Sequence, residues 1–315
     1  MHLRIISASR RTDIPAFYGQ WFMRRVRAGW CAMPNPFNSK QVSRVELRPD
    51  ITLLVFWTRW AAPFLKAVAE LKGRGFRFYF QYTLVNYPAA IDPYSPPLDR
   101  AVAAFRRLTE AIGPERVVWR YDPILLSDAT DHAFHLENFA RIAKALDGAT
   151  RGVVISILDP YAKAARRLDR LGKEQPEFKY RVYDAERDGA LMQQLARIAQ
   201  AHSLRIQSCA ETMDLTAAGI APGKCIDDQL IREVFGIDVS RKKDKGQRTA
   251  CGCIESRDIG MYDSCLFGCV YCYATRSFKA AGANHAARDP ESASMIGQHR
   301  ALPLPERRRT REWSI

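Results

Sequence analysis

Six runs rich in apolar, β-branched and aromatic residues recur along the chain, and segments of helical period separate them. The runs cover 3–9, 51–57, 76–84, 116–122, 152–159 and 204–211. Strand-like runs that alternate with helices are typical of βα units joined in a parallel sheet. The pattern therefore predicts an α/β fold, and the length of 315 residues suits a partial or full (β/α) barrel.

Between the runs, apolar residues fall at helical spacing. Phe139, Ile142, Ala143 and Leu146 make one such stripe, which predicts a helix with one buried face. The segment 34–50 lacks this period, and we expect it to form a hairpin-like insertion after the first helix.

Each strand-like run ends in polar residues. The carboxyl ends of parallel strands meet at one edge of a barrel, so we expect these side chains to line a pocket. Asp122 and Glu211 are candidate catalytic acids or bases, although a carboxylate beside Arg120 is as easily a structural ion pair. The full set is Ser7, Ser9, Arg10, Arg11, Asp13, Thr58, Arg59, Gln81, Tyr82, Thr83, Arg120, Asp122, Asp159, Gln207, Ser208, Cys209 and Glu211.

The pattern changes after residue 238. We assign 1–238 to the barrel, 239–283 to a basic linker and a cysteine-rich loop that completes the barrel, and 284–315 to a C-terminal tail. The densest basic run, 240–248, reads as a solvated linker just before the cysteines.

Composition and charge narrow the class of protein. The apolar and charged fractions are those of a globular chain. No apolar run approaches the roughly 20 residues that span a bilayer, and the first residues lack a secretory signal, so we expect a cytoplasmic protein without a membrane partner. The net charge of +14 favours an anionic substrate, with nucleic acid as one option. No phosphate-binding loop or Ser/His/Asp arrangement points to a kinase or hydrolase.

Eight cysteines in a reducing compartment favour metal or redox chemistry over disulfide bonds. Three of them, Cys265, Cys269 and Cys272, stand in the stretch CLFGCVYCYA. Thiolates this close in sequence can converge on one centre, and soft sulfur ligands select zinc, copper(I) or iron–sulfur clusters. Their spacing differs from the paired CxxC of structural zinc and from that of bacterial ferredoxins.

CLFGCVYCYA resembles the signature loop of the radical S-adenosyl-L-methionine (SAM) superfamily, CxxxCxφC, with an aromatic residue before the last cysteine. The resemblance implies that Cys265, Cys269 and Cys272 hold three irons of a [4Fe-4S] cluster, while SAM binds the fourth. It places Tyr271 near the adenine. It also implies a TIM-barrel-like fold, cleavage of SAM, hydrogen abstraction from a substrate, and a reductant such as flavodoxin or ferredoxin.

Further stretches resemble an uncharacterised bacterial family known only as domain of unknown function number eighteen forty-eight. The resemblance covers nearly the whole chain and supplies no reaction. The stretches are SASRRTDIPAFYGQWF, VFWTR, QYTL, WRYDPI, CAE, KCIDD and CGCIESRDIGMYDSC.

The order of the chain departs from the usual plan of the radical SAM superfamily, in which the three-cysteine loop follows the first strand. Here we expect 254–259 to form a short strand that feeds the loop. If this strand lies beside the N-terminal strand, the barrel is circularly permuted but keeps the same spatial order. Under this mapping Ser7, Ser9 and Asp13 are candidates for the SAM amino group, although the familiar Gly-Gly-Glu sequence is absent. Arg11 or Arg120 could pair with the SAM carboxylate.

Four other cysteines carry open alternatives. Cys251 and Cys253 are candidate metal ligands, and with Cys209 and Cys225 they could form a second metal centre. Alternatively, one cysteine, such as Cys209, could return a hydrogen atom to a product radical. Two rival functions also remain: a non-catalytic zinc-binding protein that binds nucleic acid, and an iron–sulfur electron carrier.

Overall fold

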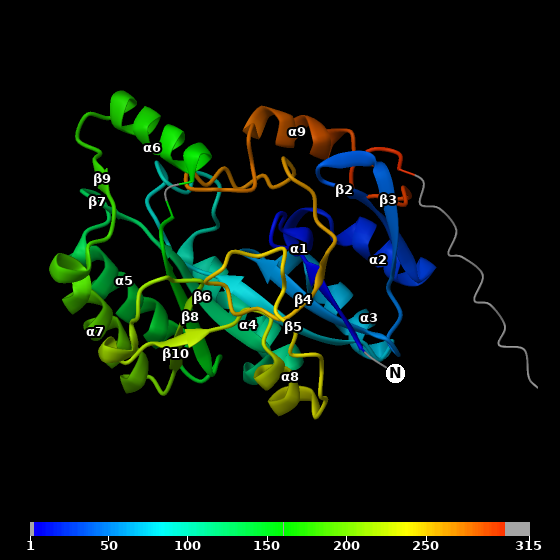
Figure 1. The fold of residues 1–315 in the computed structure, drawn as a ribbon, viewed down its shortest axis with the longest axis horizontal. Coiled ribbons are helices and arrows are strands. Elements are labelled where there is room, and N and C mark those ends of the chain that lie inside the picture. The colour runs from blue at the N-terminus through cyan, green and yellow to red at the C-terminus, as the bar shows by residue number, and fades with distance from the viewer. Residues whose placement is uncertain (1–2, 160, 300–315) are drawn as a thin grey trace, which may run out of the picture.

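The computed structural model describes residues 3–159 and 161–299, and its centre is one eight-stranded sheet (Figure 1). All neighbouring strands of this sheet are parallel, and their order is β11-β10-β8-β6-β5-β4-β1-β12. The six predicted runs are confirmed as β1, β4, β5, β6, β8 and β10. The strands are β1 (Arg4–Ala8), β4 (Thr52–Thr58), β5 (Arg77–Thr83), β6 (Val117–Ile124), β8 (Gly152–Ile157), β10 (Arg205–Cys209), β11 (Ala221–Gly223) and β12 (Arg257–Asp258).

Helices α1 to α5 and α7 pack on one face of the sheet, whereas α6 stands apart from the strands (Figure 1). The six main strands are added in sequence order in one direction, and right-handed crossovers then place the connecting helices on the same side. The shared core includes Phe56 and Phe80, whose rings stack 4.8 Å apart, together with Phe139 and Ile142 of the predicted stripe. The helices are α1 (Ile14–Phe17), α2 (Gly19–Ala28), α3 (Leu65–Gly73), α4 (Leu98–Ile112), α5 (His132–Ala145), α6 (Ala162–Glu174), α7 (Ala185–Ala201), α8 (Asp228–Phe235) and α9 (Phe278–Ala286).

Polar side chains fix where several helices begin. The carboxylate of Asp131 accepts a hydrogen bond from the amide of Phe134 at the start of α5, and Asp184 does the same for Arg187 at the start of α7. These contacts satisfy amide groups that have no partner within the helix.

The opposite face of the sheet is covered by the chain between β11 and β12. Ile226, Ile231 and Ile254 from this segment pack against Leu53 and Val55 of β4. In Figure 1 the segment, yellow to orange, runs in front of the strands. The sheet therefore has most of its helices on one side and, on the other, a returning segment that includes α8 and leads to the last strand.

β12 lies beside β1, although nearly the whole chain separates them. Ile6 pairs with Arg257 and Ser7 with Asp258 in parallel register. The prediction of a short strand within 254–259 next to the N-terminal strand is confirmed. The strand is short because only Arg257 and Asp258 pair, while Ile254 makes an isolated antiparallel bridge with Lys243.

Two small antiparallel pairs of strands stand outside the main sheet. β2 (Trp30–Asn35) and β3 (Asn38–Glu46) form the insertion predicted for 34–50, which begins earlier than expected because the strand already starts after Gly29 ends α2. β7 (Leu126–Ser127) pairs with β9 (Tyr180–Arg181).

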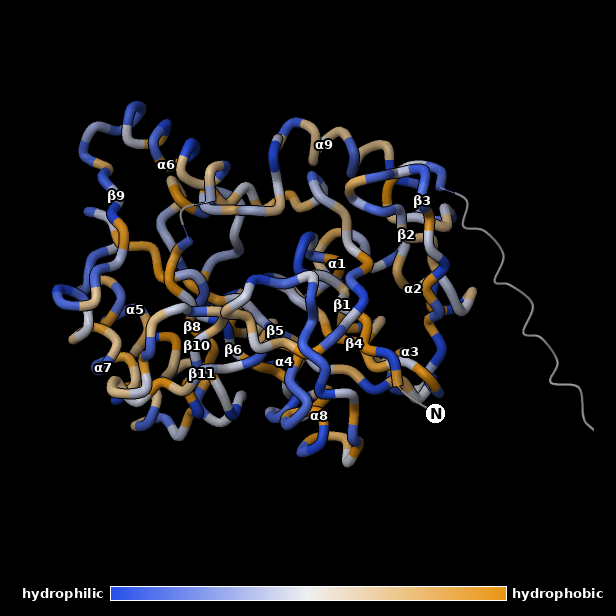
Figure 2. Tube along the Cα trace, in the orientation of Figure 1, coloured by the Kyte–Doolittle hydropathy of each residue, from blue (hydrophilic) through white to orange (hydrophobic). Residues whose placement is uncertain are grey.

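Hydrophobic and hydrophilic residues are distributed in the structure as the sequence pattern predicts. Figure 2 shows hydrophobic residues gathered in the central strands and hydrophilic residues in the outer loops. The basic run 240–248 is mostly exposed, as predicted, except that Asp244 is buried. Of the predicted tail, 284–299 lies within the described residues, where α9 extends to Ala286, and 300–315 lies outside them. Among the described helices, none combines the length and apolar character that crossing a bilayer requires.

Candidate functional site

The three-cysteine loop follows β12 directly and lies at the carboxyl edge of the sheet. Cys269 is buried, and Cys265 and Cys272 are half-buried. The amide of Cys272 donates to the carbonyl of Cys269 (3.0 Å), so the last two cysteines share one tight turn. Gly268 has a φ of +71°, a conformation in which glycine carries no steric penalty.

The thiols of this loop affect one another electrostatically. Burial, together with the nearby charges of Cys272 and Asp13, raises the pKa of Cys265 to about 12. Burial also raises the pKa of Cys269, with Asp92 and the two other cysteines adding to the effect. The three thiols therefore share one buried region, in which an added positive centre would be needed to favour the thiolate form.

Arg167 of α6 holds the loop through its backbone. Its guanidinium donates to the carbonyls of Val270 (2.8 Å), Thr275 (2.9 Å) and Cys272. All three carbonyls accept from the same guanidinium, so the side chain of Arg167 fixes the backbone of the segment that carries Cys272. This role could not be predicted from sequence, because Arg167 is one of many arginines on helices.

The aromatic residue of the motif is anchored by a buried ion pair. The hydroxyl of Tyr271 accepts from Arg59 Nη1 (2.7 Å) and donates to Asp92 Oδ2 (2.8 Å), while Arg59 and Asp92 form an ion pair. The Tyr271 ring packs edge to face against Tyr87 at 5.9 Å. The second oxygen of Asp92, Oδ1, is buried and has no hydrogen-bond partner among the described residues.

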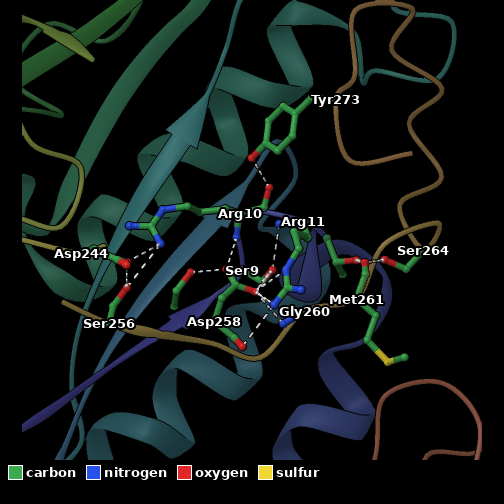
Figure 3. Close-up of polar contacts among 12 residues, drawn as sticks. Ser9, Arg10, Arg11, Asp244, Ser256, Asp258, Gly260, Met261, Ser264 and Tyr273 are labelled. Atoms are coloured by element: carbon green, nitrogen blue, oxygen red, sulfur yellow. Dashed lines mark hydrogen bonds and ion pairs between the residues drawn. The ribbon is translucent and has the colours of Figure 1, made fainter. Parts of the chain in front are cut away.

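Asp258 of β12 organises the carboxyl end of β1. Its carboxylate accepts from the hydroxyls of Ser7 (2.6 Å) and Ser9 (2.8 Å), the amide of Arg10 (2.8 Å) and the guanidinium of Arg11 (3.0 Å). Figure 3 shows Ser9, Arg10 and Arg11 gathered around Asp258. Burial alone would raise the pKa of Asp258, but Arg11, the Ser7 hydroxyl and the Arg10 amide lower it overall.

This arrangement bears on the residues predicted to bind SAM. Ser7, Ser9 and Arg11 all bond to Asp258, which the sequence reasoning missed, although its place at the polar end of 254–259 was a usable signal. Tyr273, next to the last cysteine, donates to the carbonyl of Arg10 (2.6 Å) and joins the loop to the same group (Figure 3).

Asp13 has a structural position at the start of α1. Its carboxylate accepts from the amides of Ala16 (2.9 Å) and Arg59 (2.6 Å) and from the Thr58 hydroxyl (2.9 Å). Burial raises the pKa of Asp13 to about 7 despite these bonds. Asp13 therefore joins β1 and β4 next to the cysteine loop.

Arg120 lies on β6 and contacts other groups than the three-cysteine loop. It forms an ion pair with Asp122 and donates to Gln81 Oε1 (3.3 Å) and to the sulfur of Cys225 (2.7 Å). Asp122 also accepts from the Ser156 hydroxyl. Asp122 was predicted to be either a catalytic acid or base or the partner of a structural ion pair, and the ion pair with Arg120 is formed. Arg120 also contacts Cys225, which lies outside the three-cysteine loop.

Glu211 lies just past the end of β10, where its carboxylate accepts one backbone hydrogen bond. Its Oε1 accepts from the amide of Ile157 (2.8 Å). Burial raises the pKa of Glu211 to about 7, and the negative charge of Asp122 adds to this shift. Glu211 thus has a pKa suited to proton transfer near neutral pH.

The four remaining candidate cysteines come together on the face of the sheet opposite the helices. The sulfur atoms of Cys209 and Cys225 are 3.0 Å apart, and the amides of Cys225 and Ile226 donate to the sulfur of Cys253 (3.3 and 3.4 Å). Cys251 packs in the same buried cluster. The prediction that these four cysteines come together is confirmed, although they belong to three separate segments.

Two hollows adjoin the sheet. One is lined by Arg59 and Thr83 of the predicted rim and by neighbouring residues from 84–86 and 95–101. The other is lined in part by Gln81 and Gln207. These four predicted rim residues therefore do not share one pocket. Across the described residues, no three or more His, Cys, Asp or Glu side chains are placed so that they could hold a metal ion.

Comparison with protein families identifies a match. A family model described as Domain of unknown function (DUF1848) matches residues 5–274, which include nearly all of β1, β12 and all three cysteines of the loop. No curated protein matches the chain.

Proposed function

Since the chain belongs to the DUF1848 family, whose description assigns no activity, we propose from the site itself that it is a radical SAM enzyme on a circularly permuted (β/α) barrel. Cys265, Cys269 and Cys272 are the proposed ligands of a [4Fe-4S] cluster. SAM is the proposed cosubstrate, and hydrogen abstraction from an anionic substrate is the proposed reaction.

The observation that carries the proposal is the parallel pairing of β12 with β1. It places the three-cysteine loop after an edge strand that precedes β1 in space, as in a barrel whose chain begins elsewhere. The packing of α1 to α5 and α7 on one face, with only the short α8 on the other among the described helices, supports a barrel-like winding over a doubly wound sheet.

The donor set suits a cluster better than a single ion. Three cysteines on one loop supply soft sulfur ligands, one fewer than the four protein ligands typical of structural zinc. A cluster makes a different demand, because each cysteine ligates its own iron and the sulfurs need not converge on one point.

When bound and reduced, such a cluster supplies the electron that cleaves a carbon–sulfur bond of SAM. The chain's own residues have other tasks. Arg167 fixes the loop backbone, Tyr271 is held by Arg59 and Asp92, and Asp258 orders the carboxyl end of β1. Their common effect is to keep the loop seated on the strand ends, which limits the access of water.

The proposed SAM contacts need reassigning in part. Ser7, Ser9 and Arg11 can serve SAM only by sharing their bonds with Asp258, and Arg120 is engaged with Asp122 and Cys225. The roles of Ser7, Ser9, Arg11, Asp13 and Arg120 therefore remain predictions. The net charge of +14 supports an anionic substrate, either nucleic acid or a phosphorylated or carboxylated metabolite. A flavodoxin or ferredoxin is the proposed reductant.

Anaerobic reconstitution tests this function. Protein supplied with iron and sulfide should be brown, hold about four irons at the loop, and release 5′-deoxyadenosine from SAM under dithionite. Cys269→Ala should abolish that product, whereas Cys31→Ala, which changes a buried cysteine of β2, should not. Colourless protein that holds only zinc would favour the zinc-binding alternative. A cluster that never cleaves SAM would favour the electron carrier.

A further inference from the structure

Cys209, Cys225, Cys251 and Cys253 form a four-cysteine group away from the three-cysteine loop. Cys209 ends β10, Cys225 follows β11, and the other two precede β12. Cys225, Cys251 and Cys253 are at most 7% exposed, and Cys209 packs against the same apolar cluster. Burial of four thiols at one place, from three segments, is more than an apolar core requires.

The spacing of the sulfur atoms is that of a compact site. The sulfur atoms of Cys209 and Cys225 approach to 3.0 Å, the Cys253 sulfur accepts from the amide of Cys225 (3.3 Å), and Cys251 packs in the same buried cluster. Sulfur ligands 2.3 Å from one tetrahedral zinc ion lie roughly 3.8 Å from each other. A shift of about 1 Å would therefore turn the contact into the spacing of two zinc ligands. As the side chains lie, they touch rather than surround an ion, in agreement with the absence of a ready-made metal group among the described residues.

Positive groups face these sulfurs from two sides. Arg120 donates to the Cys225 sulfur (2.7 Å), and the buried guanidinium of Arg10 is close enough to Cys253 and Cys225 to interact with them electrostatically. One nitrogen of Arg10, Nη2, is buried without a hydrogen-bond partner among the described residues. Two arginine charges match the net charge of four thiolates around a divalent cation, which is −2.

Backbone groups complete the surroundings. The amides of Cys225 and Ile226 point at the Cys253 sulfur, and hydrogen bonds to a ligand sulfur stabilise its thiolate form. Tyr79 and Gln81 donate to the carbonyl of Cys225 (2.7 and 2.9 Å) and fix this turn on β5.

We propose that Cys209, Cys225, Cys251 and Cys253 bind one zinc ion as a structural site. The ion joins β10 to the segment that crosses the sheet, and so fixes the approach to β12 and the three-cysteine loop. Binding releases the thiol protons, and its free energy adds to folding. The site is independent of the proposed function, because none of its ligands belongs to the loop at 265–272.

The test removes the three cysteines of the loop, so that metal bound to them cannot add to the metal that is measured. In the full chain carrying Cys265→Ala, Cys269→Ala and Cys272→Ala, we expect one zinc per chain after purification with reductant. After removal of zinc, Co²⁺ should bind at one equivalent, with the absorption of a tetrahedral tetrathiolate site.

Single replacements in that background locate the ligands. Cys253→Ser should lower zinc binding at least tenfold, whereas Cys31→Ala, at a buried cysteine of another cluster, should leave one zinc bound. Retention of zinc by Cys253→Ser, the presence of about four irons instead of zinc, or a Cys209–Cys225 disulfide in reduced, metal-free protein would each overturn the proposal. These measurements do not depend on SAM cleavage. The zinc site and the proposed function can therefore be refuted independently of each other.

Discussion

Ser7 of β1 and Asp258 of β12 pair in parallel register and share a hydrogen bond of 2.6 Å, although they are 251 residues apart. This contact joins the first strand of the chain to the strand that carries the three-cysteine loop. The same carboxylate holds Ser9 and Arg11, so one buried acid fixes both the edge of the sheet and the start of the proposed site.

Asp258→Asn should destabilise the fold. The change keeps the shape of the side chain but removes its negative charge. The guanidinium of Arg11 then stays buried without a charged partner, which lowers the free energy of unfolding by about 3 kcal/mol. Denaturant unfolding measures the loss. The control, Glu46→Gln, breaks the exposed pair with Arg4 of β1 and should cost less than about 1 kcal/mol. Equal effects of the two variants would show that the Asp258 contacts do not hold this edge.

Arg167→Gln should free the three-cysteine loop. Loss of bonds to three loop carbonyls weakens the closed loop by about 2 kcal/mol, so amides around 270–275 should exchange hydrogen about 30-fold faster. Hydrogen exchange read by mass spectrometry measures the rate. Arg166→Gln, next to it on α6, should change nothing in the loop, because Arg166 bonds only to a carbonyl of its own helix. Unchanged exchange in Arg167→Gln would contradict the assigned role.

Gly268→Ala should strain the turn within the motif. Its φ of +71° costs an alanine about 1–2 kcal/mol, and the added carbon would lie 2.9 Å from the Tyr94 ring. We expect a lower melting temperature and less iron after reconstitution. Gly282→Ala in α9, where no atom lies within 4 Å of the added carbon, should be neutral or stabilising. A Gly268 variant as stable as the parent would mean that the turn relaxes freely.

Glu211 should make stability depend on pH. Its pKa is about 7 in the folded state and about 4.3 in the unfolded chain, so the folded protein binds the extra proton between these values. Its contribution is complete below about pH 4 and is lost as the pH rises to about 7. Unfolding free energies measured from about pH 5 to 8 should fall less steeply in Glu211→Gln than in the parent. Glu233→Gln, at an exposed surface pair, should keep the parent slope.

Local pattern determined much of the architecture. The six strand runs and the stripe at Phe139 and Ile142 were readable because each depends on residues close together in the sequence. The motif CLFGCVYCYA and the short strand at 254–259 were readable for the same reason. Apolar periodicity decides which face is buried before any long-range contact forms.

Tertiary structure decided which groups meet. Asp258 with Arg11, Arg167 with the loop carbonyls, and Cys209 with Cys225 are contacts between segments whose pairing depends on how strands are ordered. No local propensity encodes them, because closing such long loops is driven by burial of the whole sheet rather than by the residues in contact. Ser7, Ser9 and Arg11 looked available for a ligand in the sequence, and only the return of β12 showed that an acid from the far end of the chain already occupies them.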